Sequence, residues 1–299
     1  MPLSRPNRQR RRERALKKTG APKRIDIIRA FEKRRRELYG NLQRGKPMAK
    51  QRFKNETKNK TGDIWLYGMH PVTLALQNKN RVIKEIWATR GAAAELDIPK
   101  NIPLRVAERS QIESVVGRDA VHQGVAAKAE PLPPYTINDL LADTERRDKA
   151  LAVILDQVTD PHNIGAVLRS AAAFDAKAVI IPDAGAPDET GTLAKSASGA
   201  LELVPLIKVP NLARAMETLK QNDFWCVGMD GYAKESLSAH KLPKKCVIVM
   251  GSEGDGLRRL TAENCDYMVK LPMNETIESL NVSNACAIAL YEYYRTHNG

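Results

Sequence analysis

The sequence has 299 residues, of which 42% are hydrophobic, so it can bury a sizeable core and is long enough for two domains. No apolar run approaches the ~18 residues of a membrane span, and the N-terminus lacks the apolar stretch of a secretory signal. The four cysteines form no CxxC pair. We therefore expect a cytoplasmic protein with buried thiols, and neither a membrane protein nor a metal-binding or disulfide-stapled one.

The positive charge is concentrated at the N-terminal end. Residues 1–60 hold 22 of the 48 lysines and arginines but only 5 of the 35 acidic residues, so the remainder is mildly acidic. Runs such as Arg8-Gln-Arg-Arg-Arg12 and Lys33-Arg-Arg-Arg36 repel one another, which predicts a disordered tail with one helical spacing from Ile25 to Tyr39. A basic tail of this kind favours contact with nucleic-acid phosphates, and a solubilising extension is the alternative.

Residues 62–130 alternate short apolar runs with helical spacings, which predicts a small α/β domain. We expect strands at 63–67, 82–88, 104–106 and 124–127, and helices at 72–77 and 110–116. Residues 131–148 are predicted to be a linker, because they begin with the stiff Pro131-Leu-Pro-Pro134 and end in a charged run.

Residues 149–299 alternate strand and helix patterns throughout, which predicts a parallel sheet with helices on both faces. The predicted strands are 151–156, 178–181, 203–209, 224–229, 246–250 and 267–271. The predicted helices lie at about 164–174, 192–198, 211–221, 257–263 and 282–295.

Three polar loops follow strands of this larger domain, at 156–163, 251–256 and 272–281. Open α/β sheets bind their ligands at the carboxyl ends of their strands, so we expect a site there. Asn163 is placed to cap the helix that follows the first loop, and Ser279 or Asn281 the last helix. Arg169 lies off the apolar stripe of the first helix, and that helix alone favours an ordinary surface arginine.

Three segments together resemble the signature of the SpoU (TrmH-type) family of RNA ribose 2′-O-methyltransferases, within the SPOUT superfamily. They are Asp160–Ala171, Met250–Leu257 and Leu271–Ser283, and their order and spacing match those of the family. The small-residue stretch Lys195-Ser-Ala-Ser-Gly-Ala200 also fits. The resemblance covers 150–299 well, extends less specifically to 62–130, and does not include 1–60.

This resemblance implies features that periodicity does not show. It implies a C-terminal catalytic domain with a deep trefoil knot, preceded by an L30e-like domain that binds the RNA substrate. It also implies a homodimer with active sites at the interface, and S-adenosylmethionine as the methyl donor.

The same resemblance assigns roles by position. It places the cofactor against Gly251, Leu271 and Leu280, chiefly through the backbone, with a pocket completed by Met250, Glu253, Met273 and Ser279. It makes Arg169 the central catalytic residue, surrounded by Asn163, Glu253, Ser279 and Asn281.

The implied reaction is an in-line attack of a ribose 2′-oxygen on a sulfonium methyl group, and only RNA offers that hydroxyl. Arginine is a poor general base, because the pKa of a free guanidinium exceeds ~12. Arg169 either acts as a desolvated base or clamps the target phosphate and stabilises developing alkoxide charge, and we favour the clamp.

The two-domain layout resembles the ribosomal branch of the family, which predicts a guanosine of 23S rRNA as the target. A tRNA ribose methyltransferase and a non-catalytic RNA-binding ribosome-assembly factor on the same fold are the alternatives. A Rossmann nucleotide-binding enzyme is disfavoured, because no G-x-G-x-x-G follows the first strand of the larger domain.

Overall fold

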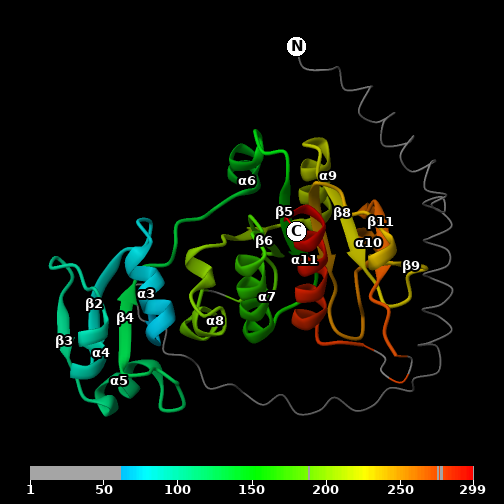
Figure 1. Cartoon of the computed structure of the whole chain (residues 1–299). Coiled ribbons are helices and arrows are strands. Elements are labelled where there is room, and N and C mark those ends of the chain that lie inside the picture. Colours follow the sequence, from blue (N-terminus) through cyan, green and yellow to red (C-terminus); the bar gives the residue numbers. More distant parts are fainter. Residues whose placement is uncertain (1–61, 188, 275, 277–278, 299) are drawn as a thin grey trace. The chain divides into compact units, whose positions relative to one another are not determined.

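The structure is a computed structural model that describes residues 62–187, 189–274, 276 and 279–298. The predicted basic tail at 1–60 lies outside the described residues. Within them the chain forms two β-sheets, one between residues 62 and 130 and one between residues 149 and 298, each with its own helices (Figure 1). We call these regions the small sheet unit and the large sheet unit.

The small sheet unit contains a mixed four-stranded sheet in the order β1-β4-β2-β3. Its elements are β1 Ile64–Tyr67, α3 Met69–Gln77, β2 Ile83–Ala88, α4 Arg90–Glu95, β3 Leu104–Val106, α5 Arg109–Val116 and β4 Val125–Ala129. β4 pairs antiparallel with β1 and β2, whereas β2 and β3 are parallel. The predicted α/β character is correct, but helix α4 is missing from the prediction because its Ala-rich run is short.

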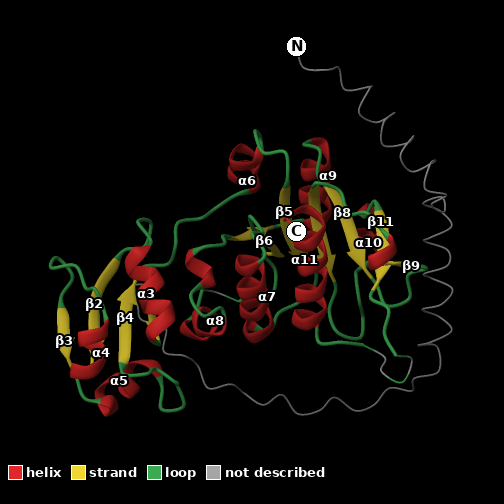
Figure 2. Cartoon of the chain, viewed as in Figure 1, coloured by secondary structure: helices red, strands yellow, loops and turns green. Residues whose placement is uncertain are grey.

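The large sheet unit contains a seven-stranded parallel sheet in the order β7-β6-β5-β10-β8-β11-β9. Figure 2 shows strands of this sheet in yellow among helices in red. The strands are β5 Ala150–Leu155, β6 Val179–Pro182, β7 Leu206–Val209, β8 Trp225–Met229, β9 Glu235–Ser236, β10 Lys245–Met250 and β11 Tyr267–Lys270. Its helices are α7 Pro161–Ala173, α8 Gly191–Ser196, α9 Leu212–Gln221, α10 Arg259–Asn264 and α11 Val282–Asn298, and α6 Ile137–Thr144, which precedes the unit in sequence, packs on the same sheet. Two 3-10 turns, η1 Ala200–Glu202 and η2 Leu237–Ala239, complete it.

Alternate residues of the interior strand β5 enter two different apolar cores, which explains why every residue of this strand is apolar. Leu151, Val153 and Leu155 join a core with α7, α8 and α11, whereas Ala150, Ala152 and Ile154 join a core with α6 and α9. Helices therefore cover both faces of the sheet, as predicted. Figure 1 shows α7 and α11 side by side over one of these faces.

Some boundaries differ from the prediction. The strand predicted at 203–209 is shorter, because residues 200–202 form η1 and β7 begins at Leu206. The two-residue strand β9 is too short to give a period-2 signal. The segment 131–148, predicted to be a linker, contains helix α6, whose Leu140 is fully buried in the second core.

The cysteines behave as expected for buried thiols. Cys226, Cys246 and Cys286 are buried, Cys265 is half-buried, and no disulfide joins these four described cysteines. Burial raises the pKa of the Cys286 thiol to about 12. These side chains therefore belong to the apolar core.

Candidate functional site

The first and second polar loops meet because β5 and β10 are neighbours in register, with Leu155 opposite Met250. The strand order reverses between these two strands, so their carboxyl ends form the crevice where parallel α/β sheets place ligands. The N–H of Asp156 donates to the carbonyl of Met250 at 2.8 Å, which holds the two loop origins together. Two of the three polar loops thus lie together at this edge of the sheet.

The loop after β10 is a tight turn that closes on itself. Ser252 and Gly256 exchange backbone hydrogen bonds at 3.2 and 3.0 Å, and Gly254 and Gly256 have φ of +89° and +65°. A Cβ on Gly251 would lie 2.2 Å from the carbonyl carbon of Gly256, so the backbone approaches itself too closely for any side chain there. Gly251, Gly254 and Gly256 occupy positions where any other residue would clash or be strained. At these positions the loop therefore presents main-chain groups and no side chains.

Asp156 anchors the far end of that loop. Its side chain is completely buried, and it accepts hydrogen bonds from the N–H of Arg258 at 3.0 Å and from the Nε of Arg258 at 2.6 Å. A buried carboxylate requires such pairing. No role was predicted for Asp156 from the sequence, although a carboxylate that directly follows a wholly apolar strand can indicate a buried anchor.

Glu253, Asn163 and Asn281 are brought together from three different segments. The Nδ2 of Asn281 donates to Oε1 of Glu253 at 2.8 Å and to Oδ1 of Asn163 at 3.0 Å. Oε1 of Glu253 also accepts from the N–H of Val282 at 3.1 Å, which places a carboxylate at the positive N-terminal end of α11. Three of the predicted catalytic residues thus form one hydrogen-bonded cluster, which we call the Asn163–Glu253–Asn281 cluster.

The predicted helix caps are partly wrong. Helix α7 begins at Pro161 and its cap is Asp160, whose carboxylate accepts from the N–H of His162 at 2.9 Å. Asn163 therefore lies inside the first turn, where its side chain is available for the cluster. At α11 the cap is Asn281, whose Oδ1 accepts from the N–H of Ser283 at 2.9 Å.

The remaining predicted site residues do not join the cluster among the described contacts. Arg169 is exposed on α7, and within the described residues no hydrogen bond or ion pair joins it to the cluster. Met250 is buried at the end of β10, Leu271 and Leu280 are half-buried, and Met273 and Ser279 are exposed. Leu271 follows β11, which is separated from β10 by β8.

Helices α7 and α8 are in close contact beside the cluster. A Cβ on Gly165 of α7 would lie 2.4 Å from the Cβ of Ser196, and the Oγ of Ser196 lies 3.0 Å from the Nδ1 of His162. The small residues of the 195–200 stretch therefore allow this approach.

No helix among those described is both long and apolar enough to cross a membrane. In the same part of the chain, His, Cys, Asp and Glu side chains form no group of three suited to a metal ion.

Two protein-family models match the sequence. The SpoU rRNA methylase family matches residues 150–291, and a family described as RNA 2′-O ribose methyltransferase substrate binding matches residues 65–135. These ranges coincide closely with the large and small sheet units.

Curated relatives are similar over most of their length. The 23S rRNA (guanosine-2′-O-)-methyltransferase RlmB of Pseudomonas putida is 40% identical over 240 residues, which are 77% of this chain and 95% of that protein. RlmB of Escherichia coli K12 is 38% identical over 237 residues, which are 77% of this chain and 97% of that protein.

Solved structures share the fold. The SpoU methyltransferase AviRb of Streptomyces viridochromogenes superposes with a TM-score of 0.68 at 24% identity, over 81% of this chain and 92% of that chain. The same protein in complex with its cofactor AdoMet gives a TM-score of 0.66 at 22% identity, over 80% and 91% of the two chains. At these identities the likeness establishes the α/β architecture with its parallel sheet.

Proposed function

Because the chain belongs to the SpoU rRNA methylase family, we propose that it methylates a ribose 2′-oxygen of RNA, using S-adenosylmethionine as the donor. The substrate is 23S rRNA and the target nucleotide a guanosine, as the names of its RlmB relatives suggest. We propose a cytoplasmic location, because the protein would meet a ribosomal substrate there. The observation that carries the proposal is the Asn163–Glu253–Asn281 cluster at the carboxyl edge of β5 and β10.

The residues at this edge fit S-adenosylmethionine, which supplies a methyl group already activated by its positive sulfur. Gly251 allows the backbone after β10 to fold back closely on itself, so main-chain groups of this loop would contact the cofactor, and the buried Met250 would supply apolar surface beside them. Leu271 and Leu280 are half-buried and Met273 and Ser279 are exposed, and these four residues would complete the site that holds the cofactor. We propose that the chain is knotted here, because a knot would bring the loops after β10 and β11 against one ligand.

The chain's own groups align the ribose. Glu253 holds Asn281 and the first turn of α11 in place, so Asn281 and Asn163 offer fixed polar groups beside the reacting oxygen. Arg169 is exposed on α7, and its guanidinium fork suits the phosphate next to the target ribose. In this position it clamps the nucleotide and stabilises negative charge that develops on the 2′-oxygen.

We also propose a homodimer that pairs through α11 and the end of α7. Ile288, Tyr291 and Tyr294 of α11 are 45%, 52% and 37% exposed, and Phe174 contacts both tyrosine rings at centroid distances of 5.8 and 5.9 Å. A continuous apolar face of this kind is typical of a subunit interface. A dimer through this face would cover it and bring two copies of α7 together.

The other segments serve RNA binding. We assign residues 62–130 to an L30e-like domain that binds the substrate, supported by the family match at 65–135. Residues 149–299 carry the methyltransferase site, and 131–148 connect the two regions. The basic tail at 1–60 draws the RNA towards a mildly acidic body.

The deciding experiment measures methyl transfer from labelled S-adenosylmethionine to purified rRNA and tRNA, with wild-type protein beside Arg169→Ala. We expect label on a guanosine ribose of 23S rRNA and its loss in the variant. Label in tRNA would keep the chemistry and overturn the substrate. Tight RNA binding without transfer to free RNA or to precursor ribosomal particles would favour an assembly factor.

A further inference from the structure

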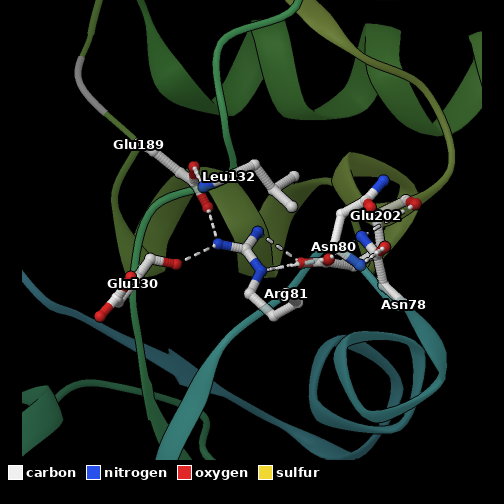
Figure 3. A network of polar contacts seen from close by, with 7 residues as sticks. All are labelled: Asn78, Asn80, Arg81, Glu130, Leu132, Glu189 and Glu202. Carbon is white, nitrogen blue, oxygen red and sulfur yellow. Dashed lines mark hydrogen bonds and ion pairs between the residues drawn. The ribbon is translucent and has the colours of Figure 1, made fainter.

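The guanidinium of Arg81 is completely buried where the small sheet unit meets the large one. Its Nη2 donates to Oε1 of Glu202 at 2.6 Å, and its Nε donates to both carboxylate oxygens of Glu202 at 3.1 and 3.2 Å (Figure 3). Its Nη1 donates to the backbone carbonyl of Glu130 at 2.8 Å. Arg81 precedes β2, whereas Glu202 ends η1, so this contact joins the two units.

Two carboxylates of the large sheet unit converge on this one guanidinium. Oε1 of Glu189 lies 2.6 Å from Nη1 of Arg81 as an ion pair outside hydrogen-bond geometry, and Oε2 of Glu189 accepts from the N–H of Leu132 at 3.0 Å. Glu202 is only 2% exposed in its side chain and also accepts from Nδ2 of Asn78 at 2.7 Å. We call these groups the Arg81 network (Figure 3).

The main effect of such a network is on geometry. A buried ion pair contributes little net stability, because its desolvation offsets most of its attraction. A shifted docking of the two units, however, would leave buried charges unpaired, and that is strongly unfavourable. The network therefore favours one relative position of the two units.

Close backbone contacts around the network leave the two units little room to shift against each other. A Cβ on Gly199, which has φ of +85°, would lie 2.5 Å from the side chain of Leu74. A Cβ on Gly191 would lie 2.4 Å from the carbonyl oxygen of Trp65. The backbone of 191–199 thus rests directly on the small sheet unit.

The same stretch contacts the helix that carries the site. Ser196 lies against Gly165 and beside His162, both of which belong to α7. Helix α7 also carries Asn163 and Arg169. An unbroken set of contacts therefore leads from Arg81, through η1 and α8, to two of the groups that we assign to the reaction.

We infer that Arg81 is a positioning residue for methyl transfer. It fixes the position of the small sheet unit against α8 and η1. RNA bound by that unit would therefore present one particular ribose to the Asn163–Glu253–Asn281 cluster. This inference rests on the proposed function, because it requires that the small sheet unit binds the substrate.

The test compares Arg81→Met and Glu202→Gln with Lys84→Met in the full-length protein. Lys84 lies three residues from Arg81 but pairs with Asp63 at 2.7 Å and Glu130 at 3.2 Å, so it serves as a matched control that does not reach the large sheet unit. We expect kcat, normalised to the fraction of protein that binds S-adenosylmethionine, to fall about 10- to 100-fold in both network variants. Small misplacements of a reacting group, here the target ribose, have effects of this size. Dissociation constants for S-adenosylmethionine and for 23S rRNA should change by less than about twofold.

Mapping of the methylated nucleotides gives a second readout that simple destabilisation would not change. We expect the network variants to label riboses next to the target, and Lys84→Met to label the target alone. Normal kcat and normal site choice in folded Arg81→Met and Glu202→Gln would overturn the inference. Glu202→Gln keeps the volume of the side chain, so it remains informative if Arg81→Met does not fold.

Hydrogen–deuterium exchange tests, independently of activity, whether Arg81 holds the two units together. Amides of 65–67 and 191–202 should exchange faster in Arg81→Met, while those of β5 and β10 should not change. Unchanged exchange at 65–67 and 191–202 would show that Arg81 does not hold the two units together. If the wild-type protein methylates no RNA, the proposed function fails, and this measurement alone decides whether Arg81 holds the units together.

Discussion

The side-chain amide of Asn281 donates to the carboxylate of Glu253 at 2.8 Å, although 28 residues separate them. The Oδ1 of Asn281 is occupied by the N–H of Ser283, so its Nδ2 must face Glu253 and Asn163. One amide group therefore caps α11 and joins the first turn of α7 to the loop that follows β10. Its chemistry can be tested by exchanging the amide for a carboxylate.

Asn281→Asp should reduce methyl transfer by about 10²-fold, because the new carboxylate faces Glu253 and loses both donated hydrogen bonds. The helix cap survives, since aspartate accepts from the N–H of Ser283 equally well. Steady-state kinetics and thermal melting would show lost kcat with little change in Tm. Asn284→Asp, at an exposed position of the same helical turn, is the control and should retain activity. Equal losses in the two variants would indicate a general charge effect.

Gly251→Ala should weaken binding of S-adenosylmethionine at least about tenfold, because its methyl group would overlap the carbonyl carbon of Gly256 and force the loop open. Calorimetric titration of the cofactor measures the effect. Gly231→Ala serves as the control, since a Cβ there meets nothing within 4 Å. Wild-type affinity in Gly251→Ala would show that the loop after β10 does not form the cofactor pocket.

Most strands of the large sheet unit could be predicted from the sequence because runs such as β5 and residues 246–250 of β10 are unbroken, apolar and buried on both faces. Helix α6 was not predicted because Leu140 and Thr144 are its only buried residues and charged neighbours conceal that pattern. Asn163, Glu253 and Asn281 were predicted from motif resemblance. Their mutual contact depends on the strand order, which no local pattern contains. The Arg81 network escaped prediction for the same reason, because an arginine before a short strand has no local partner.

Arg169→Ala should lower kcat by about 10²- to 10³-fold without a change in Tm, as is typical when a group that stabilises transition-state charge is removed. The pH–rate profile distinguishes the two roles considered for Arg169. A clamp predicts a profile of unchanged shape and reduced height. A basic limb that moves on substitution would show that the guanidinium acts as the base instead. Arg214→Ala, which removes an exposed arginine from α9, should leave both height and shape intact.

Removal of residues 1–60 should weaken RNA binding and flatten its dependence on salt. Each phosphate that the tail neutralises releases counterions and contributes roughly −0.7 to the slope of log K against log salt on single-stranded RNA. Residues 62–299 carry a slight acidic excess, so little of the slope should remain after the deletion. Binding isotherms at several salt concentrations measure this.

The affinity for S-adenosylmethionine provides the control for that deletion. It should not change, because the cluster and the loop after β10 involve only residues beyond 150. A parallel loss of cofactor binding would show that the tail supports the fold. A full salt slope without the tail would place the phosphate contacts on the sheet units, for example at the arginines and lysines of residues 81–128.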